Sequence, residues 1–185
     1  AYTEGLRDGV PIGLGYLSVS FGFGITAVNL GIQVWNAIII SMTNLTSAGQ
    51  VAGIGIIAAS GAIIEMILTQ LIINIRYALM SIVLTQRLEP SYSTGHKFLT
   101  SFFITDEIFA VASSNKEKVG FKYMVGLILT PVIGWVSGTL TGAIAGNILP
   151  EIVISALGLA IYGMFIAIVV PVIKKEKWTA LCVAT

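Results

Sequence analysis

The stretch FITDEIFAV, residues 103–111, places two adjacent carboxylates, Asp106 and Glu107, inside an otherwise apolar run. The side chains one helical turn away from them, at i±3 and i±4, include no cation. A buried carboxylate is costly unless it is paired, hydrated or protonated. These two acids must therefore meet a partner from another part of the chain, meet water, or carry a proton.

The composition of the 185-residue chain is that of a membrane protein. Hydrophobic residues make up 56% of the sequence and charged residues only 10%, and the mean hydropathy is +0.93. A soluble domain carries about a quarter charged residues, so this chain has too few to cover a water-facing surface. Several continuous apolar runs reach the roughly 20 residues that a transmembrane helix needs. We therefore expect an all-α, polytopic helical bundle of about six to seven transmembrane segments.

Six apolar segments can be read along the chain, and a seventh is expected to begin at Trp178. The six cover residues 10–32, 34–59, 60–85, 98–114, 121–147 and 152–173. Their loops predict the orientation, because cytoplasmic loops carry excess Lys and Arg. With the N-terminus inside, the basic loops NKEKVGFK and KKEK lie inside with Arg7, while Arg87 and Lys97 lie outside against the rule. The opposite orientation would place both strongly basic loops outside, so we expect a cytoplasmic N-terminus.

Three segments are expected to be interrupted. Segment 34–59 carries NLTSAGQ, residues 44–50, near its middle, segment 98–114 is short and holds the acidic pair, and segment 121–147 contains Pro131. Non-helical backbone in a bilayer survives only where protein or a water-filled cavity covers it. Many secondary transporters build their substrate sites from such interrupted helices.

Arg76 is the predicted partner of Asp106. Arg76 lies nine residues before the end of segment 60–85, and Asp106 lies eight residues after the start of segment 98–114. At about 1.5 Å per residue, both lie roughly 12–14 Å below the same boundary. The pair could fix helix register only, or it could also line a substrate pathway. Glu107 diverges from Asp106 by about 100°, so we expect it to face a cavity, another helix or a partner subunit.

Further candidate site residues come from segments 60–85 and 34–59. Glu65 lies eleven residues before Arg76 and so returns to nearly the same helix face, while Asn74 points to the opposite face of a regular helix. Glu65 could line a pathway or could reach water at the interface. If the NLTSAGQ stretch unwinds, its N–H groups could hold a carboxylate and its oxygens an ammonium group; otherwise its small residues pack a continuous helix. Its candidate substrate-binding residues are Asn44, Thr46, Ser47, Gly49 and Gln50.

Signatures of catalysis are weak. His96 is the only histidine and falls in a predicted loop, no cluster of His, Cys and acidic residues suggests a metal, and no ATP-binding loop is present. We therefore expect neither an enzyme nor a cofactor. A carboxylate beside an arginine, such as Asp106, could bind a proton and so couple transport to the proton gradient.

Six stretches taken together resemble the AzlC-type branched-chain amino acid permeases. They are GLRDGVPIGLGYLSVSFGFG, TSAGQ, NIRYALMS, FFITDEIFAV, FKYMVGLILTPVIGWVSG and LGLAIYGMFIAIVVP, in this order. The resemblance covers essentially the whole chain. The residues that match family positions are Gly49, Gln50, Asn74, Arg76, Thr105, Asp106 and Glu107.

The resemblance implies export of branched-chain amino acids together with a small hydrophobic membrane subunit of AzlD type. Residues 1–185 would then form one membrane transport domain that lacks the family's last one or two C-terminal helices. We expect a secondary transporter in a prokaryotic cytoplasmic membrane, with valine, leucine, isoleucine or methionine as its substrate. The alternative is a non-transporting scaffold or accessory subunit of a multi-chain membrane complex.

Overall fold

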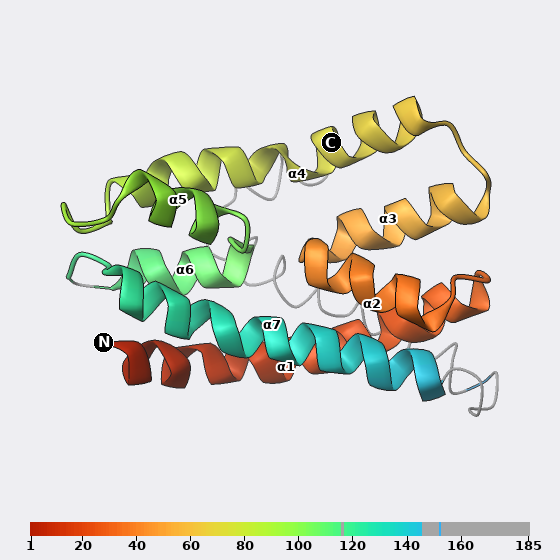
Figure 1. Cartoon of the computed structure of the whole chain (residues 1–185), viewed down its shortest axis with the longest axis horizontal. Helices are drawn as coiled ribbons and strands as arrows, with labels where there is room; N and C mark the ends of the chain where they lie inside the picture. The colour runs from red at the N-terminus through yellow and green to blue at the C-terminus, as the bar shows by residue number, and fades with distance from the viewer. Residues whose placement is uncertain (116, 146–151, 153–185) are drawn as a thin grey trace, which may run out of the picture.

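The computed structural model describes residues 1–115, 117–145 and 152, and within these ranges the chain is all-helical (Figure 1). This confirms the predicted all-α, polytopic helical fold class. Among the described residues, three helices are long and apolar enough to cross a membrane: α1, α4 and α7. The predicted segment 152–173, apart from residue 152, and the helix expected from Trp178 lie outside the described residues. The helices are α1 (Tyr2–Asn29), α2 (Val34–Thr43), α3 (Ser47–Ala58), α4 (Ile63–Thr85), α5 (Thr94–Ser101), α6 (Asp106–Ser114) and α7 (Phe121–Ala145).

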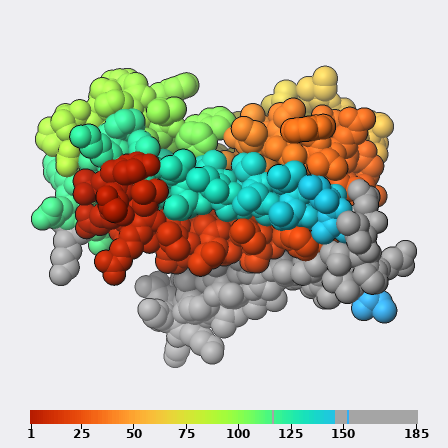
Figure 2. Space-filling model, turned by 60° about the horizontal axis from the view of Figure 1, so that its bottom comes forward, coloured from red at the N-terminus to blue at the C-terminus, as the bar shows by residue number. Residues whose placement is uncertain are grey.

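Helices α1 and α7 run parallel and lie in close contact along their length. Near their starts, a Cβ atom built at Gly5 would meet the backbone of Tyr123; near their ends, one built at Gly24 would meet the backbone of Thr139. Glycine on both helices allows this close approach of two backbones. Figure 2 shows the two helices side by side, with the other helices gathered over their two ends.

Segment 34–59 does not cross the bundle but turns back on itself. It forms two helices, α2 and α3, joined at residues 44–46. Ala37 at the beginning of this hairpin and Ile54 near its end share one apolar cluster with Phe23, from the second half of α1. Leu45, in the joint, instead packs against the middle of α1. The segment therefore begins and ends at the same end of the bundle and reaches only its middle.

Segment 98–114 turns back in the same way from the opposite end. It forms α5 and α6, joined at residues 102–105. The loops before and after this hairpin meet, because Leu88 forms a parallel bridge with Val119 and the Glu89 N–H donates to the Val119 carbonyl at 3.1 Å. Phe103, in the joint, packs against the same apolar cluster as Leu45 of the first hairpin. In Figure 1 the two hairpins approach each other between α4 on one side and α1 with α7 on the other.

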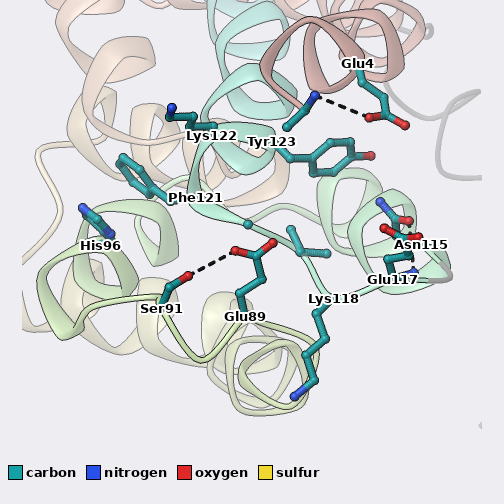
Figure 3. A pocket seen from close by; sticks show the side chains of 13 residues that line it. Glu4, Glu89, Ser91, His96, Asn115, Glu117, Lys118, Phe121, Lys122 and Tyr123 are labelled. Carbon is teal, nitrogen blue, oxygen red and sulfur yellow. Dashed lines mark hydrogen bonds and ion pairs between the residues drawn. The ribbon is translucent and has the colours of Figure 1, made fainter.

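This arrangement overturns the predicted topology of the loops. Ala1, Glu89 and Lys118 line one pocket, so the N-terminus and both loops around the second hairpin lie together, at what we call the near end (Figure 3). The prediction that the loop before 98–114 and the loop after it lie on opposite sides is wrong, because the break at residues 102–105 reverses the chain. Among the described basic residues, all except Arg76 now fall at or close to the near end; they are Arg7, Arg87, Lys97, Lys118 and Lys122.

Two of the three predicted interruptions are present and the third is wrong. Helix α7 continues through Pro131 without a break. A proline removes the backbone bond to the residue four positions earlier, here the Leu127 carbonyl, but one lost bond does not end a membrane helix. Pro131 is buried and packs close to Gly13 of α1. The close contact with α1 therefore supports the helix where the sequence suggested a break.

Candidate functional site

The joints of the two hairpins meet halfway along the bundle. Leu45 from the first joint and Phe103 from the second belong to one apolar cluster with Tyr16 of α1 and Trp135 of α7. Tyr16 and Trp135 pack edge to face, with ring centroids 5.2 Å apart. Both α3 and α6 start at these joints, so the positive ends of two helix dipoles point toward the middle of the bundle. We call this region the central site.

The predicted ion pair between Arg76 and Asp106 is present in the central site. Arg76 Nη1 lies 2.7 Å from Asp106 Oδ2. Arg76 Nη2 also donates to the Tyr77 hydroxyl at 3.1 Å, and the guanidinium carbon lies 4.9 Å from the centre of the Tyr77 ring. The two side chains of the ion pair remain 40% and 34% exposed. Charges at this depth cannot face lipid cheaply, so we expect water, substrate or another polypeptide to cover the exposed part of the pair.

Glu107 faces another helix, which was one of its three predicted surroundings. Its Oε2 lies 2.5 Å from the Tyr16 hydroxyl oxygen, which also lies 2.7 Å from Thr105 Oγ1. A phenol has one proton and a carboxylate can only accept. The single Tyr16 proton therefore has two acceptors, Glu107 Oε2 and Thr105 Oγ1, and the shorter distance and the negative charge of the carboxylate favour donation to Glu107. Thr105 also caps α6, because its Oγ1 accepts from the Ile108 N–H.

The two helix starts in the central site differ in charge. Helix α6 carries Asp106 and Glu107 in its first turn and has a side-chain cap. Helix α3 has no acidic residue in its first turn and no side-chain cap, although Thr46 occupies the cap position. Asn44 Oδ1 accepts from the Thr46 N–H at 3.3 Å, and no side chain among the described residues caps the first N–H groups of α3 itself. The start of α3 therefore keeps its positive potential and can attract a carboxylate.

Gly49 lies at the contact between α3 and α4. Gln70 Nε2 donates to the Gly49 carbonyl at 2.7 Å, and Asn74 Nδ2 donates to Gln70 Oε1 at 3.1 Å. A Cβ atom built at Gly49 would collide with Thr46 Oγ1 and lie 2.7 Å from Gln70 Oε1. A larger residue here would displace the Thr46 and Gln70 side chains, so glycine allows the predicted residues Thr46, Gly49 and Asn74 to come together.

A buried polar chain ties the first hairpin to α7. Gln50 is 1% exposed, and its Nε2 donates to Ser41 Oγ at 3.2 Å. Ser41 Oγ lies 2.7 Å from Thr139 Oγ1, and both residues are fully buried. Gln50 thus links both arms of the hairpin to α7 and supports the joint from behind.

Several polar atoms around the central site are inaccessible and have no hydrogen-bond partner among the described residues. Buried polar groups of this kind are normally satisfied by protein, water or ligand. Several such unsatisfied atoms gathered around two helix starts are typical of a site that holds water or a small polar molecule. They are Thr46 Oγ1, Gln50 Oε1, Asn74 Oδ1, Arg76 Nε and Trp135 Nε1.

The structure does not bring every predicted residue to the central site. Glu65 lies exposed in the first turn of α4, beside Gly61, at the end of the bundle away from the N-terminus. Ser47 is the first residue of α3 and lies at the joint. Sequence reasoning missed Tyr16, although a hydroxyl in the middle of an apolar helix is a readable signal. It also missed Gln70, which lies four residues before Asn74 and so on the same helix face.

A separate surface pocket of about 430 Å³ lies at the near end (Figure 3). Glu4 and Lys118 are among its lining residues, and the His96 and Phe121 rings stack on each other with centroids 3.8 Å apart. None of the predicted site residues lines this pocket. Its position among the loops makes it part of the water-facing surface and not of the central site.

Known proteins resemble this chain along most of its length. An uncharacterized membrane protein of Archaeoglobus fulgidus is 30% identical over 175 residues, which cover 94% of this chain and 76% of that protein. The inner membrane protein YgaZ of Escherichia coli is 27% identical over 189 residues, covering 98% of this chain and 76% of that protein. An uncharacterized membrane protein of Helicobacter pylori is 24% identical over 153 residues, which cover 80% of this chain and 65% of that protein.

The same comparisons identify the family. No solved structure matches this chain. The family described as AzlC protein matches residues 11–149, which include both hairpins and the whole central site. Together with the membrane-protein relatives, this match shows that the chain belongs to the AzlC family of membrane proteins.

Proposed function

We propose that this chain is a secondary transporter that exports branched-chain or similar small apolar amino acids across the cytoplasmic membrane. Family membership supports a transporter-type role. The observation that carries the proposal is the meeting of two hairpin joints, one from each end of the bundle, around charged and unsatisfied polar groups. Secondary transporters place their substrates at such mid-depth interruptions.

The two helix starts match the two charged ends of an amino acid. The uncapped start of α3 at Thr46 and Ser47 supplies free N–H groups for the substrate carboxylate. The acidic start of α6, at Asp106 and Glu107, attracts the ammonium group. A zwitterion placed between them satisfies both ends at once.

The apolar side chains of the central site suit a branched aliphatic substrate. Leu45, Phe103, Tyr16 and Trp135 form the apolar cluster at the joints. An apolar pocket separates substrates that differ by one methylene by only about 1–3 kcal/mol. Valine, leucine, isoleucine and methionine are therefore all proposed substrates, with modest preferences among them.

The distribution of basic residues supports a cytoplasmic N-terminus. The described Lys and Arg residues lie at or close to the near end, except Arg76. By the positive-inside rule this distribution supports a cytoplasmic near end, with no exception among the loop residues that the structure describes. The turn-back of segment 98–114 removes the conflict that Arg87 and Lys97 created in the sequence-based topology.

A small hydrophobic subunit of AzlD type is the proposed partner. The Arg76–Asp106 pair is partly open, and α4 exposes most of its apolar side chains. Lipid can cover the apolar face, but a mid-depth ion pair is better covered by water or protein. A second subunit beside α4 would close the central site on this flank.

Transport is tested by the export of labelled valine, leucine and methionine from cells that carry this chain with and without such a subunit. Thr46→Val removes a hydroxyl from the start of α3, and we expect transport efficiency to fall roughly 10–100-fold, the usual effect of losing one hydrogen bond to a charged group. Thr43→Val is the matched control, because the Thr43 hydroxyl is exposed and bonds only to its own helix backbone. If the chain exports none of these amino acids under either condition, the proposal is wrong.

A further inference from the structure

Asp106 and Glu107 are adjacent in the chain, but the structure gives them different partners. Asp106 faces the Arg76 guanidinium at 2.7 Å, which stays charged at any physiological pH. Glu107 accepts a hydrogen bond from the neutral phenol of Tyr16 at 2.5 Å. Protonating Asp106 would leave Arg76 as an unpaired cation, which is costly. Protonating Glu107 removes no ion pair, so Glu107 is the acid that can exchange a proton.

The charges of the central site do not balance. Arg76 contributes one positive charge, while Asp106 and Glu107 contribute two negative charges, which leaves a net charge of −1. A net charge at mid-depth is unfavourable in a bilayer, so one further positive charge from solution is needed. The other described polar groups near Glu107 are neutral, namely the hydroxyls of Tyr16, Thr105 and Tyr77. On the α7 side, Val132 and Trp135 pack against Tyr16 and add no charge.

We propose that Glu107 is the coupling site of the transporter and binds either a proton or the substrate ammonium group, but never both. This inference rests on the proposed function, because it requires an amino acid in the central site. Each of the two cations brings the site to neutrality, and the single carboxylate cannot hold both. Their competition links each amino acid that leaves to one proton that enters.

The exchange conserves protons and charge. When the substrate departs outside, the Glu107 carboxylate takes one proton from the external solution, and its new O–H can donate to the Tyr16 oxygen. When the next substrate binds from the cytoplasm, its ammonium group replaces that proton, which leaves to the cytoplasm. Each cycle exports one zwitterion and imports one positive charge, so both the pH gradient and the membrane potential drive export.

Leucine binding to the purified full chain, measured between about pH 5 and 8, tests the competition. For the wild type we expect affinity to weaken at low pH, approaching about tenfold per pH unit for a single competing proton. Glu107→Gln should bind leucine at least roughly tenfold more weakly, with an affinity that does not change with pH. Glu65→Gln is the matched control, since Glu65 is exposed on α4 outside the central site, and it should behave as the wild type.

Proton release provides a second readout that does not depend on the variant. In weakly buffered solution, leucine added to the wild type at low pH should release up to one proton per molecule bound. Leucine binding without proton release overturns the coupling proposal, as does a Glu107→Gln variant that keeps the wild-type pH dependence. If Glu107→Gln does not bind leucine at all, proton release from the wild type alone decides whether the coupling proposal stands. If the wild type shows no exchange of any tested amino acid in vesicles, the proposed function itself fails.

Discussion

Gly134→Ala should weaken the contact between α1 and α7. A Cβ atom built at Gly134 would collide with the Gly13 carbonyl oxygen and lie 2.8 Å from its carbonyl carbon and 3.0 Å from its Cα. All three are backbone atoms, so no side-chain rotation relieves the overlap. The two helices must move apart, and the neighbouring contacts of Gly138 and Gly142 with α1 lengthen with them.

The expected loss of stability is about 3 kcal/mol. Overpacking in a well-packed interior costs about 1–3 kcal/mol, and we expect the upper value because the obstacle is backbone and the contact continues along the helix. For a chain of this size, 3 kcal/mol corresponds to a fall in melting temperature of roughly 6–12 °C. Thermal unfolding of the purified full chain, followed by tryptophan fluorescence, measures this fall.

Gly15→Ala is the matched control on the same helix pair. Nothing lies within 4 Å of a Cβ atom built at Gly15. Alanine favours a helix over glycine by up to about 1 kcal/mol, so this variant should melt at the wild-type temperature or above. If the Gly134→Ala variant has the same melting temperature as the Gly15→Ala variant, the close parallel packing of α1 and α7 is refuted.

Two further predictions concern topology and the ion pair. In a cysteine-free background, Lys97→Cys and Lys118→Cys should react with a membrane-impermeant maleimide from the same side of the membrane. Ser60→Cys should react from the opposite side. Labelling of positions 97 and 118 from opposite sides would mean that segment 98–114 crosses the membrane. Arg76→Leu should lower the free energy of unfolding by about 2 kcal/mol, below the 3–5 kcal/mol of a fully buried pair because both side chains are partly exposed. Adding Asp106→Leu should recover most of this loss in chemical or thermal unfolding, and an additive loss would argue against direct pairing.

The sequence was sufficient to predict the Arg76–Asp106 pair and two helix interruptions. Depth counting needs only segment boundaries and the rise per residue. The structure keeps the boundary at residue 85, where α4 ends, and the two charges meet at matching depth below it. The breaks at residues 44–46 and 102–105 follow from polar residues in apolar runs. These predictions depend on local sequence, which single-chain reasoning reads well.

The direction of each broken segment could not be read from the sequence. Two half-helices that turn back have the same hydropathy as one helix that crosses, so segment 34–59 satisfied the length criterion for a span. The contacts that reveal the turn, such as Leu88 with Val119, join residues far apart in the chain. Tyr16 and Glu107 are also separated by 91 positions. Periodicity gives no information about such pairs.

The central claim is that an amino acid binds between the starts of α3 and α6. Ser47→Cys in a cysteine-free background places one thiol at the start of α3, and its alkylation rate can be measured in purified full-length chain with increasing leucine. We predict that leucine slows the reaction, whereas it leaves a Ser60→Cys variant at the exposed end of the first hairpin unaffected. An alkylation rate at position 47 that stays constant while leucine is being exchanged across vesicles would place the substrate elsewhere and contradict this account.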